Sequence, residues 1–210
     1  MLDAVLAPHH EAGARASVDQ EPSVPRDWPG TYCPNFSDWA PGDIVLVYRQ
    51  DILLGAALQV GQAFSLNPLM ALSSHLTHAG IYVGDGMMMD ASWGRGVDLV
   101  SVWGYCQSRS IELRRLQDPS IPANQVAGIA AKALTHRGEP YSTVGLVLSK
   151  LWPGVQPDWE RLFCSTFVAL VVTEATGVKL ASEPQHRPFY PSMLGRHPDL
   201  TTVLLEWRAV

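Results

Sequence analysis

The sequence has few lysines and no long uninterrupted hydrophobic stretch. Only three of its 15 basic residues are Lys, and the net charge is −5. Without clustered cationic residues, an interface for nucleic-acid phosphates is not expected. The longest apolar region, 52–72, is interrupted by polar residues and a proline, so we do not expect it to span a bilayer. The first residues lack the basic and apolar regions of a secretory signal, so synthesis in the cytoplasm without a signal peptide is expected.

Cysteine is also scarce. Cys33, Cys106 and Cys164 are odd in number and far apart, which excludes a disulfide framework and a CxxC zinc site. The zinc-protease motif HExxH is absent. We therefore expect no metal and no organic cofactor.

The remaining composition favours a globular fold. With 210 residues, 47% hydrophobic and 17% charged, the chain can form one domain with a sizeable core. Residues 1–29 are rich in Ala, Pro, Glu and Ser without a regular period, which predicts a flexible leader or an arm that covers a cleft. Residues 30–210 are expected to form a single domain.

Hydrophobic patterns predict strands first and helices later. We expect order to begin near Trp39. The predicted strands are 44–48, a strand through His78 that ends near Gly84, 87–91, 96–100, 111–116 and 202–206, with a helical turn at 102–106. The predicted helices are 52–65, one with its apolar stripe at 126–134, 142–151 and 158–175. This order predicts an α+β fold, with a small, mostly antiparallel sheet packed against helices.

Cys164 and His78 are the residues most suited to chemistry. A helix start and a nearby imidazole both lower the pKa of a thiol, and Cys164 stands where the helix predicted at 158–175 could begin. The small polar Ser165 beside it suits a helix start that faces a cleft. If the helix instead begins at Asp158, Cys164 lies in the second turn and gains less. Inert packing in the core is the alternative for Cys164, and the interpretation we adopt for Cys106 and Cys33.

Asp90 is the candidate to orient His78. If 84–86 form a three-residue hairpin loop, Gly80 pairs with Asp90, which places Asp90 diagonal to His78 on one face. A two-residue loop would shift the register and turn Asp90 to the other face. His75 precedes the regular strand and is a weaker candidate than His78.

The motifs occur in an order that resembles a known family. They are Gly42-Asp43, the run 74–82, Asp90-Ala91, Arg114-Arg115-Leu116, Gly138-Glu139-Pro140-Tyr141 and Phe163-Cys164-Ser165. The chain resembles the circularly permuted branch of the NlpC/P60 papain-like superfamily, the YiiX/YebB-like proteins related to lecithin–retinol acyltransferase. The resemblance covers about 40–175.

The resemblance implies roles for individual residues. Cys164 would be the nucleophile, His78 the general base and Asp90 the orienting residue. Tyr141 would line the cleft or help to hold the oxyanion, unless it is a packed aromatic. Three further candidates for the cleft or the oxyanion site are Tyr82, Trp93 and Ser165.

The implied activity is a cysteine hydrolase that cleaves an amide, with peptide stems of bacterial peptidoglycan as the expected substrate. Without a signal peptide, we expect export by dedicated secretion machinery as an antibacterial effector, with an immunity protein as a second partner. One alternative is an acyltransferase or thioesterase with an apolar groove lined by Leu53, Leu54, Phe64 and 87–89, although the Met run also suits an ordinary core. Another is a binding module without catalysis.

Overall fold

The computed structural model describes residues 22–48, 76–92, 94–106, 111–140, 164–181 and 189–210. Its main element is a six-stranded sheet in the order β5-β4-β3-β2-β6-β7, in which all neighbouring strands are antiparallel. The strands are β2 (Ile44–Val47), β3 (His78–Gly84), β4 (Met87–Ser92), β5 (Gly96–Ser101), β6 (Ile111–Leu116) and β7 (Leu200–Val203). The sheet and its helices confirm the predicted α+β class.

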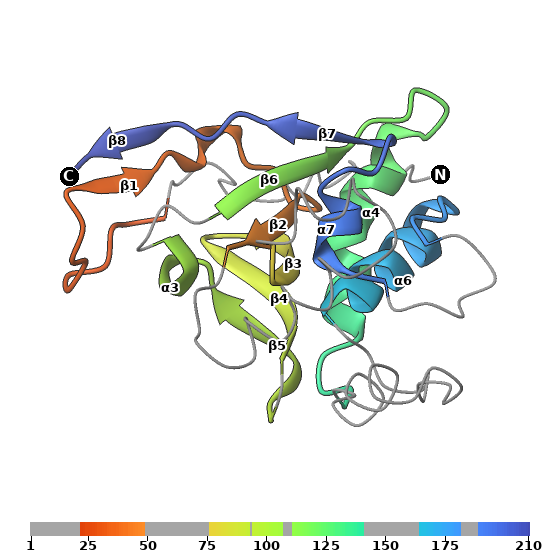
Figure 1. Ribbon diagram of the computed structural model, residues 1–210, viewed down its shortest axis with the longest axis horizontal. Helices are drawn as coiled ribbons and strands as arrows, with labels where there is room; N and C mark the ends of the chain where they lie inside the picture. The colour runs from red at the N-terminus through yellow and green to blue at the C-terminus, as the bar shows by residue number, and fades with distance from the viewer. Residues whose placement is uncertain (1–21, 49–75, 93, 107–110, 141–163, 182–188) are drawn as a thin grey trace, which may run out of the picture.

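The sheet separates two hydrophobic clusters. The helices α4 (Ala123–Thr135), α6 (Cys164–Thr176) and α7 (Pro191–Leu194) lie on one side, and α3 (Trp103–Cys106) and the β1–β8 ribbon lie on the other (Figure 1). The ribbon joins β1 (Tyr32–Pro34) to β8 (Trp207–Ala209), and the short 3₁₀ helix η1 (Phe36–Asp38) follows β1. Ile44 and Leu46 face the cluster that contains α4 and α6, whereas Val45 and Val47 face the other, as the two-residue period of a strand requires.

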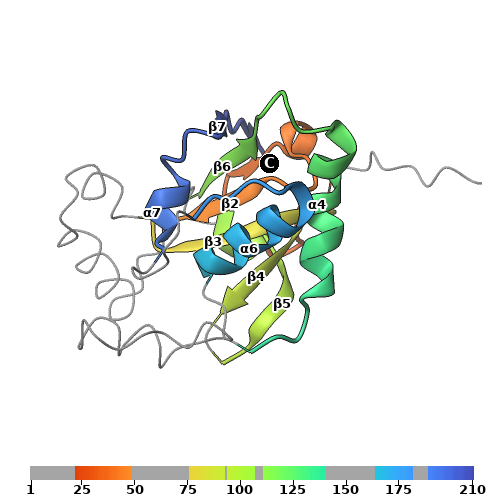
Figure 2. The same ribbon diagram turned by 90° about the vertical axis from the view of Figure 1, so that its right-hand side faces the viewer.

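The helices on the first side follow the predicted apolar patterns. In α4, Ile129, Ala130 and Ala133 are buried, but Leu134 is 45% exposed, so its place in the predicted stripe was wrong. In α6, the side chains of Phe167, Val168, Val171 and Val172 are fully buried. Figure 2 shows both helices in front of the sheet.

Two glycines mark where these helices end. Gly138 follows α4 with φ of 91°, and Gly177 follows α6 with φ of 80°; both values favour glycine. The Gly138 N–H donates to the carbonyl of Val97 at 2.8 Å, which ties the end of α4 to β5. The predicted helices 52–65 and 142–151 lie outside the described residues, as does 158–163.

The sheet differs from the prediction at its edge. The strand predicted at 202–206 is β7, which spans Leu200–Val203, because its pairing with β6 begins with Leu200 opposite Leu116. Leu204 lies just beyond β7 and is 81% exposed. β1, β8 and η1 were not predicted, since three-residue elements are too short to show a period.

Residues upstream of Trp39 already pack against the rest of the fold, although ordered structure was expected to begin near Trp39. Trp28 makes an edge-to-face contact with Trp103 of α3, with ring centroids 5.0 Å apart. Asp43, at the start of β2, is 1% exposed and accepts two hydrogen bonds from Arg115 of β6, at 2.7 and 2.8 Å. This bidentate pair joins β2 to β6 at the end of β2 that lies away from His78.

Candidate active site

His78 opens β3 and is almost completely buried, with 7% of the residue exposed. Its Nε2 lies 2.9 Å from Oδ2 of Asp90 on β4. Because Nε2 bonds to Asp90, Nδ1 is the ring nitrogen left to face another group. The pair meets across the β3–β4 hairpin, so its geometry depends on the register of the two strands.

The register of this hairpin places Asp90 beside His78 by an unexpected route. Gly80 pairs with Asp90 and Tyr82 pairs with Met88, as predicted, but Gly84 rather than Val83 pairs with Met87. The loop therefore has two residues, Asp85 and Gly86, both with positive φ as a type I′ turn requires. The predicted three-residue loop was wrong, yet Asp90 keeps the predicted face.

A β-bulge explains this outcome. The register shifts between Tyr82 and Gly84, which leaves Val83 as an extra residue on β3. The two-residue turn alone would shift the register by one and turn Asp90 away from His78. The extra residue compensates for that shift.

Asp90 is fully buried and accepts hydrogen bonds from four side chains. Besides His78, the donors are Tyr105 to Oδ2 at 2.6 Å, Ser92 to Oδ1 at 3.0 Å, and Arg95 to Oδ1 at 2.9 Å and Oδ2 at 3.2 Å. Burial alone would raise the pKa of Asp90, but the bonds and charges of His78, Tyr105 and Arg95 lower it to about 2. Asp90 is therefore a carboxylate at neutral pH.

Cys164 is the first residue of α6, and the sulfur interacts with the His78 ring. Figure 2 shows the first turn of α6 and the start of β3 at the same end of the sheet. Burial lowers the pKa of His78, but the hydrogen bonds with Asp90 and Cys164 and their charges outweigh it and raise the pKa to about 9. The structure thus brings together Cys164, His78 and Asp90, which the sequence places up to 86 positions apart.

Three residues around Asp90 were not found from the sequence. Tyr105 of α3 also stacks on the His78 ring, with centroids 5.6 Å apart and an interplanar angle of 22°. Ser92 lies two residues after Asp90 on the same strand face, a spacing that could have indicated it. Arg95 and Tyr105 reach Asp90 through a loop and a helix whose positions no sequence pattern reveals.

The other predicted site residues are either buried away from the His78–Asp90 pair or lie outside the described residues. Tyr82 is 4% exposed, its ring packs against Trp39 and its hydroxyl accepts the N–H of Gly86, so the structure places it in the core. Ser165 is 2% exposed and its hydroxyl donates to the carbonyl of Phe189, which holds that segment against α6. Trp93, Tyr141 and His75 lie outside the described residues.

The three thiols are free and buried, but they have different surroundings. Cys106 of α3 is fully buried, and this burial, with a smaller effect from Cys33, raises the pKa of its thiol to about 12. Cys33 of β1 accepts a hydrogen bond from Arg208 at 3.3 Å. Of the three, Cys164 is the thiol beside an imidazole, which is the environment of reactive cysteines.

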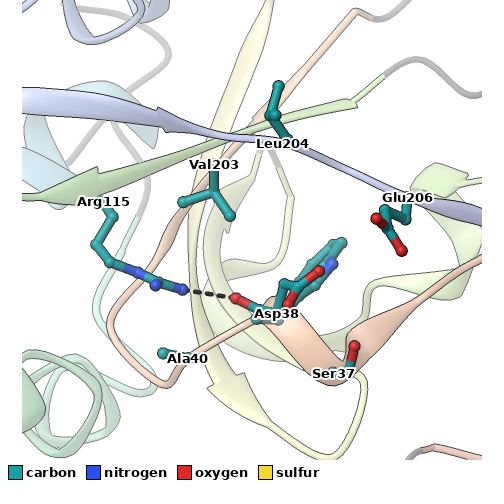
Figure 3. Close-up of a pocket in the computed structure, with 8 residues that line it drawn as sticks. Ser37, Asp38, Ala40, Arg115, Val203, Leu204 and Glu206 are labelled. Carbon is teal, nitrogen blue, oxygen red and sulfur yellow. Dashed lines mark hydrogen bonds between the residues drawn. The ribbon is translucent and has the colours of Figure 1, made fainter.

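A separate pocket lies at the other end of β2. Its volume is about 630 Å³, and it is lined by Ser37, Asp38, Trp39, Ala40, Arg115, Val203, Leu204 and Glu206 (Figure 3). Arg115 donates to the backbone carbonyl of Asp38 at 2.7 Å within it. The pocket contains none of the residues around His78 and is not part of the candidate active site.

Two further findings concern metal ligands and membrane-spanning helices. Among the residues that the structure describes, no group of three or more His, Cys, Asp or Glu side chains is arranged to hold a metal ion. No helix within the described ranges is long and apolar enough to cross a membrane.

Comparisons with known proteins support the fold. No family model matches the chain, and no curated protein matches its sequence. The fold is similar to the crystal structure of the metalloprotein YiiX from Escherichia coli O157:H7, with a TM-score of 0.55 and 18% sequence identity. The match covers 80% of this chain and 98% of YiiX, so nearly the whole fold of that protein is present here.

Proposed function

We propose that this protein is a cysteine hydrolase that cleaves an amide bond by acyl transfer to Cys164. The observation that carries the proposal is the buried His78 ring, which interacts with Cys164 and is held at Nε2 by the ionised Asp90. An imidazole between a thiol and a carboxylate is the arrangement that activates a cysteine nucleophile. The similarity of the fold to YiiX is compatible with this role.

The reaction follows from the positions of these groups. His78 takes the thiol proton, and the thiolate attacks the carbonyl carbon of the substrate. The backbone N–H groups at the start of α6 are suited to stabilise the oxyanion, because first-turn N–H groups have no partner inside the helix. His78 then donates its proton to the leaving amine, and a water molecule, deprotonated by His78, hydrolyses the thioester and releases the acid.

Asp90 keeps its negative charge throughout this cycle. Its carboxylate stays ionised and stabilises the imidazolium that forms when His78 takes a proton. The stacked Tyr105 ring restricts the orientation of the imidazole. The proton moves between Cys164, His78 and substrate, and not to Asp90.

The substrate that we propose is the peptide stem of bacterial peptidoglycan. It follows from the resemblance to NlpC/P60 proteins. We further propose export to the periplasm of a target cell and inhibition by an immunity protein, because a toxic activity on the cell wall of another cell would require both. YiiX is described as a metalloprotein. Among the residues that the structure describes, no three His, Cys, Asp or Glu side chains could hold a metal ion, and the carboxylate of Asp90 pairs with Arg95.

The alternatives gain less support. Met88 and Met89 are fully buried, in the two clusters on opposite faces of the sheet, so they do not line an acyl groove together. Leu53, Leu54 and Phe64 lie outside the described residues. A binding module without catalysis would not require the interaction between Cys164 and a buried imidazole.

The test is incubation of purified peptidoglycan, and separately of acyl-ester lipids, with the protein and with Cys164→Ala. We expect new muropeptides from the unaltered protein and none from the variant. Cys33→Ala, a change in the β1–β8 ribbon, is the matched control and should retain activity. Acyl release from the lipids without muropeptides would instead identify an acyltransferase or thioesterase, and activity that survives in Cys164→Ala would contradict the proposed mechanism.

A further inference from the structure

Arg95 lies in the short loop between β4 and β5, with its guanidinium on the carboxylate that also holds His78. Its Nη2 donates to both oxygens of Asp90, and to the hydroxyl of Ser92 at 3.0 Å. The side chain is 42% exposed, whereas Asp90 is fully buried. One buried carboxylate thus serves two cationic partners, the imidazolium and the guanidinium, when His78 is protonated.

Two cations on one carboxylate compete for its negative charge. The guanidinium of Arg95 repels the imidazolium of His78. It also offsets part of the negative charge of Asp90, which weakens the attraction between Asp90 and the imidazolium. We propose that Arg95 is a positioning residue that acts through Asp90, fixing the carboxylate toward His78 and limiting how tightly the ring holds its proton. The proposal deepens the proposed function and rests on it.

The strength with which His78 binds its proton matters because His78 has to donate that proton to the leaving amine. A base that binds its proton too tightly is a poor acid toward the leaving amine, and general acid–base catalysis is most efficient when both transfers remain possible near the working pH. A buried Asp–His pair without a second cation would favour the imidazolium further. Arg95 counteracts this effect while leaving the hydrogen bond at Nε2 intact.

The other groups around the pair do not replace Arg95. Tyr105 of α3 donates a neutral hydroxyl to Oδ2, and Cys164 of α6 faces the ring itself. Asp98 on β5 is directly opposite Asp90, and its carboxylate is paired with Arg137 at 2.9 Å. Arg95 is the described cation that contacts Asp90 besides His78, so its replacement removes that charge while the Asp98 pair stays.

The test is an NMR titration of His78, assigned by comparison with His78→Gln, in the full chain. In Arg95→Gln we expect the pKa of His78 to rise by roughly 0.5–1 pH unit, because one screened positive charge beside its carboxylate partner is removed. Arg95→Lys, which keeps the charge, should change it less. The control is Lys132→Gln, because the Lys132 side chain is 39% exposed and pairs with Glu174 near the far end of α6.

A His78 pKa in Arg95→Gln that is unchanged or lower would overturn the inference. If Arg95→Gln does not fold, Arg95→Met, which also removes the charge but keeps a long side chain, takes its place with the same expected rise, and an unchanged or lower His78 pKa there overturns the inference too. The titration needs no substrate, so it separates the two ideas. Muropeptide release with no shift in Arg95→Gln refutes the role of Arg95 alone, and a shift without any cleavage refutes the hydrolase alone.

Discussion

Replacement of Asp90 by Asn is the most direct test of the charge arrangement. The side chain keeps its size but loses its charge, and its amide group cannot accept from all of the donors that surround Asp90. Asp90 and Cys164 together raise the pKa of His78 from 6.5 to about 9 against the effect of burial. Without the carboxylate, only Cys164 opposes the effect of burial, and we expect the pKa of His78 to fall by roughly 1–3 pH units, the size of the effect of one close opposite charge.

The same change should alter the reactivity of Cys164. The proton affinity of the imidazole sets how much thiolate–imidazolium pair exists, so a fall of about 2 pH units reduces that pair by up to about 100-fold. The rate of carboxamidomethylation of Cys164 by iodoacetamide at pH 6 should decrease accordingly. Asp118→Asn is the control and should leave the rate unchanged, because the carboxylate of Asp118 accepts hydrogen bonds from Ser120, in a loop that contains none of the residues around His78.

The stability of the protein should follow the same titration. A folded-state pKa of about 9 against 6.5 for the free side chain means that protonated His78 stabilises the fold fully below pH 6.5. This contribution is lost as the pH rises to 9 and amounts to about 3 kcal/mol for a difference of about 2.5 pH units. Urea unfolding at pH 6, 7, 8 and 9 should show this decline in the unaltered protein and a much flatter profile in Asp90→Asn. A His78 titration that is the same in both proteins would refute the reasoning.

Two further predictions concern reactivity and packing. Iodoacetamide at pH 6 should label Cys164 much faster than Cys106, whose buried thiol stays protonated, and mass spectrometry of tryptic peptides can measure this; equal slow labelling would contradict an activated thiol. Gly80→Ala should lower the free energy of unfolding by about 1–3 kcal/mol, because the new Cβ would lie 2.8 Å from the backbone oxygen of Met89. Gly104→Ala, where a Cβ meets nothing within 4 Å, is the control, and urea midpoints of both variants compare them.

The sequence predicts the sheet better than it predicts the surroundings of the site. The strands 44–47, 87–92 and 111–116 could be found because alternating or continuous apolar residues mark them, and Ile44–Val47 is buried on both faces. The α+β class follows from their order. By contrast, β1 and β8 are held by pairing between distant parts of the chain, which leaves no local signal.

Cys164 and His78 could be singled out because their residue types are rare in such positions. Tyr105 and Arg95 could not, since a tyrosine in an apolar helical turn and an arginine between two glycines are ordinary surface or core residues until the fold is known. Their contacts with Asp90 depend on the tertiary positions of α3 and the β4–β5 loop. The environment of the carboxylate is therefore a property of the fold rather than of any motif.

The bulge at Val83 makes the pairing of Gly80 with Asp90 depend on the number of residues in each strand rather than on the residue type at the bulge. Many side chains could occupy position 83, and its deletion would leave Gly84 opposite Met87 and Tyr82 opposite Met88, so Asp90 would stay opposite Gly80. A residue deleted from β4 between Met87 and Asp90 would instead turn Asp90 toward the face of the sheet on which α4 and α6 pack. An unsatisfied carboxylate would then lie in the apolar layer, and His78 would lose its partner. Within this hairpin, deletions in β4 should therefore be far more damaging than the deletion of Val83.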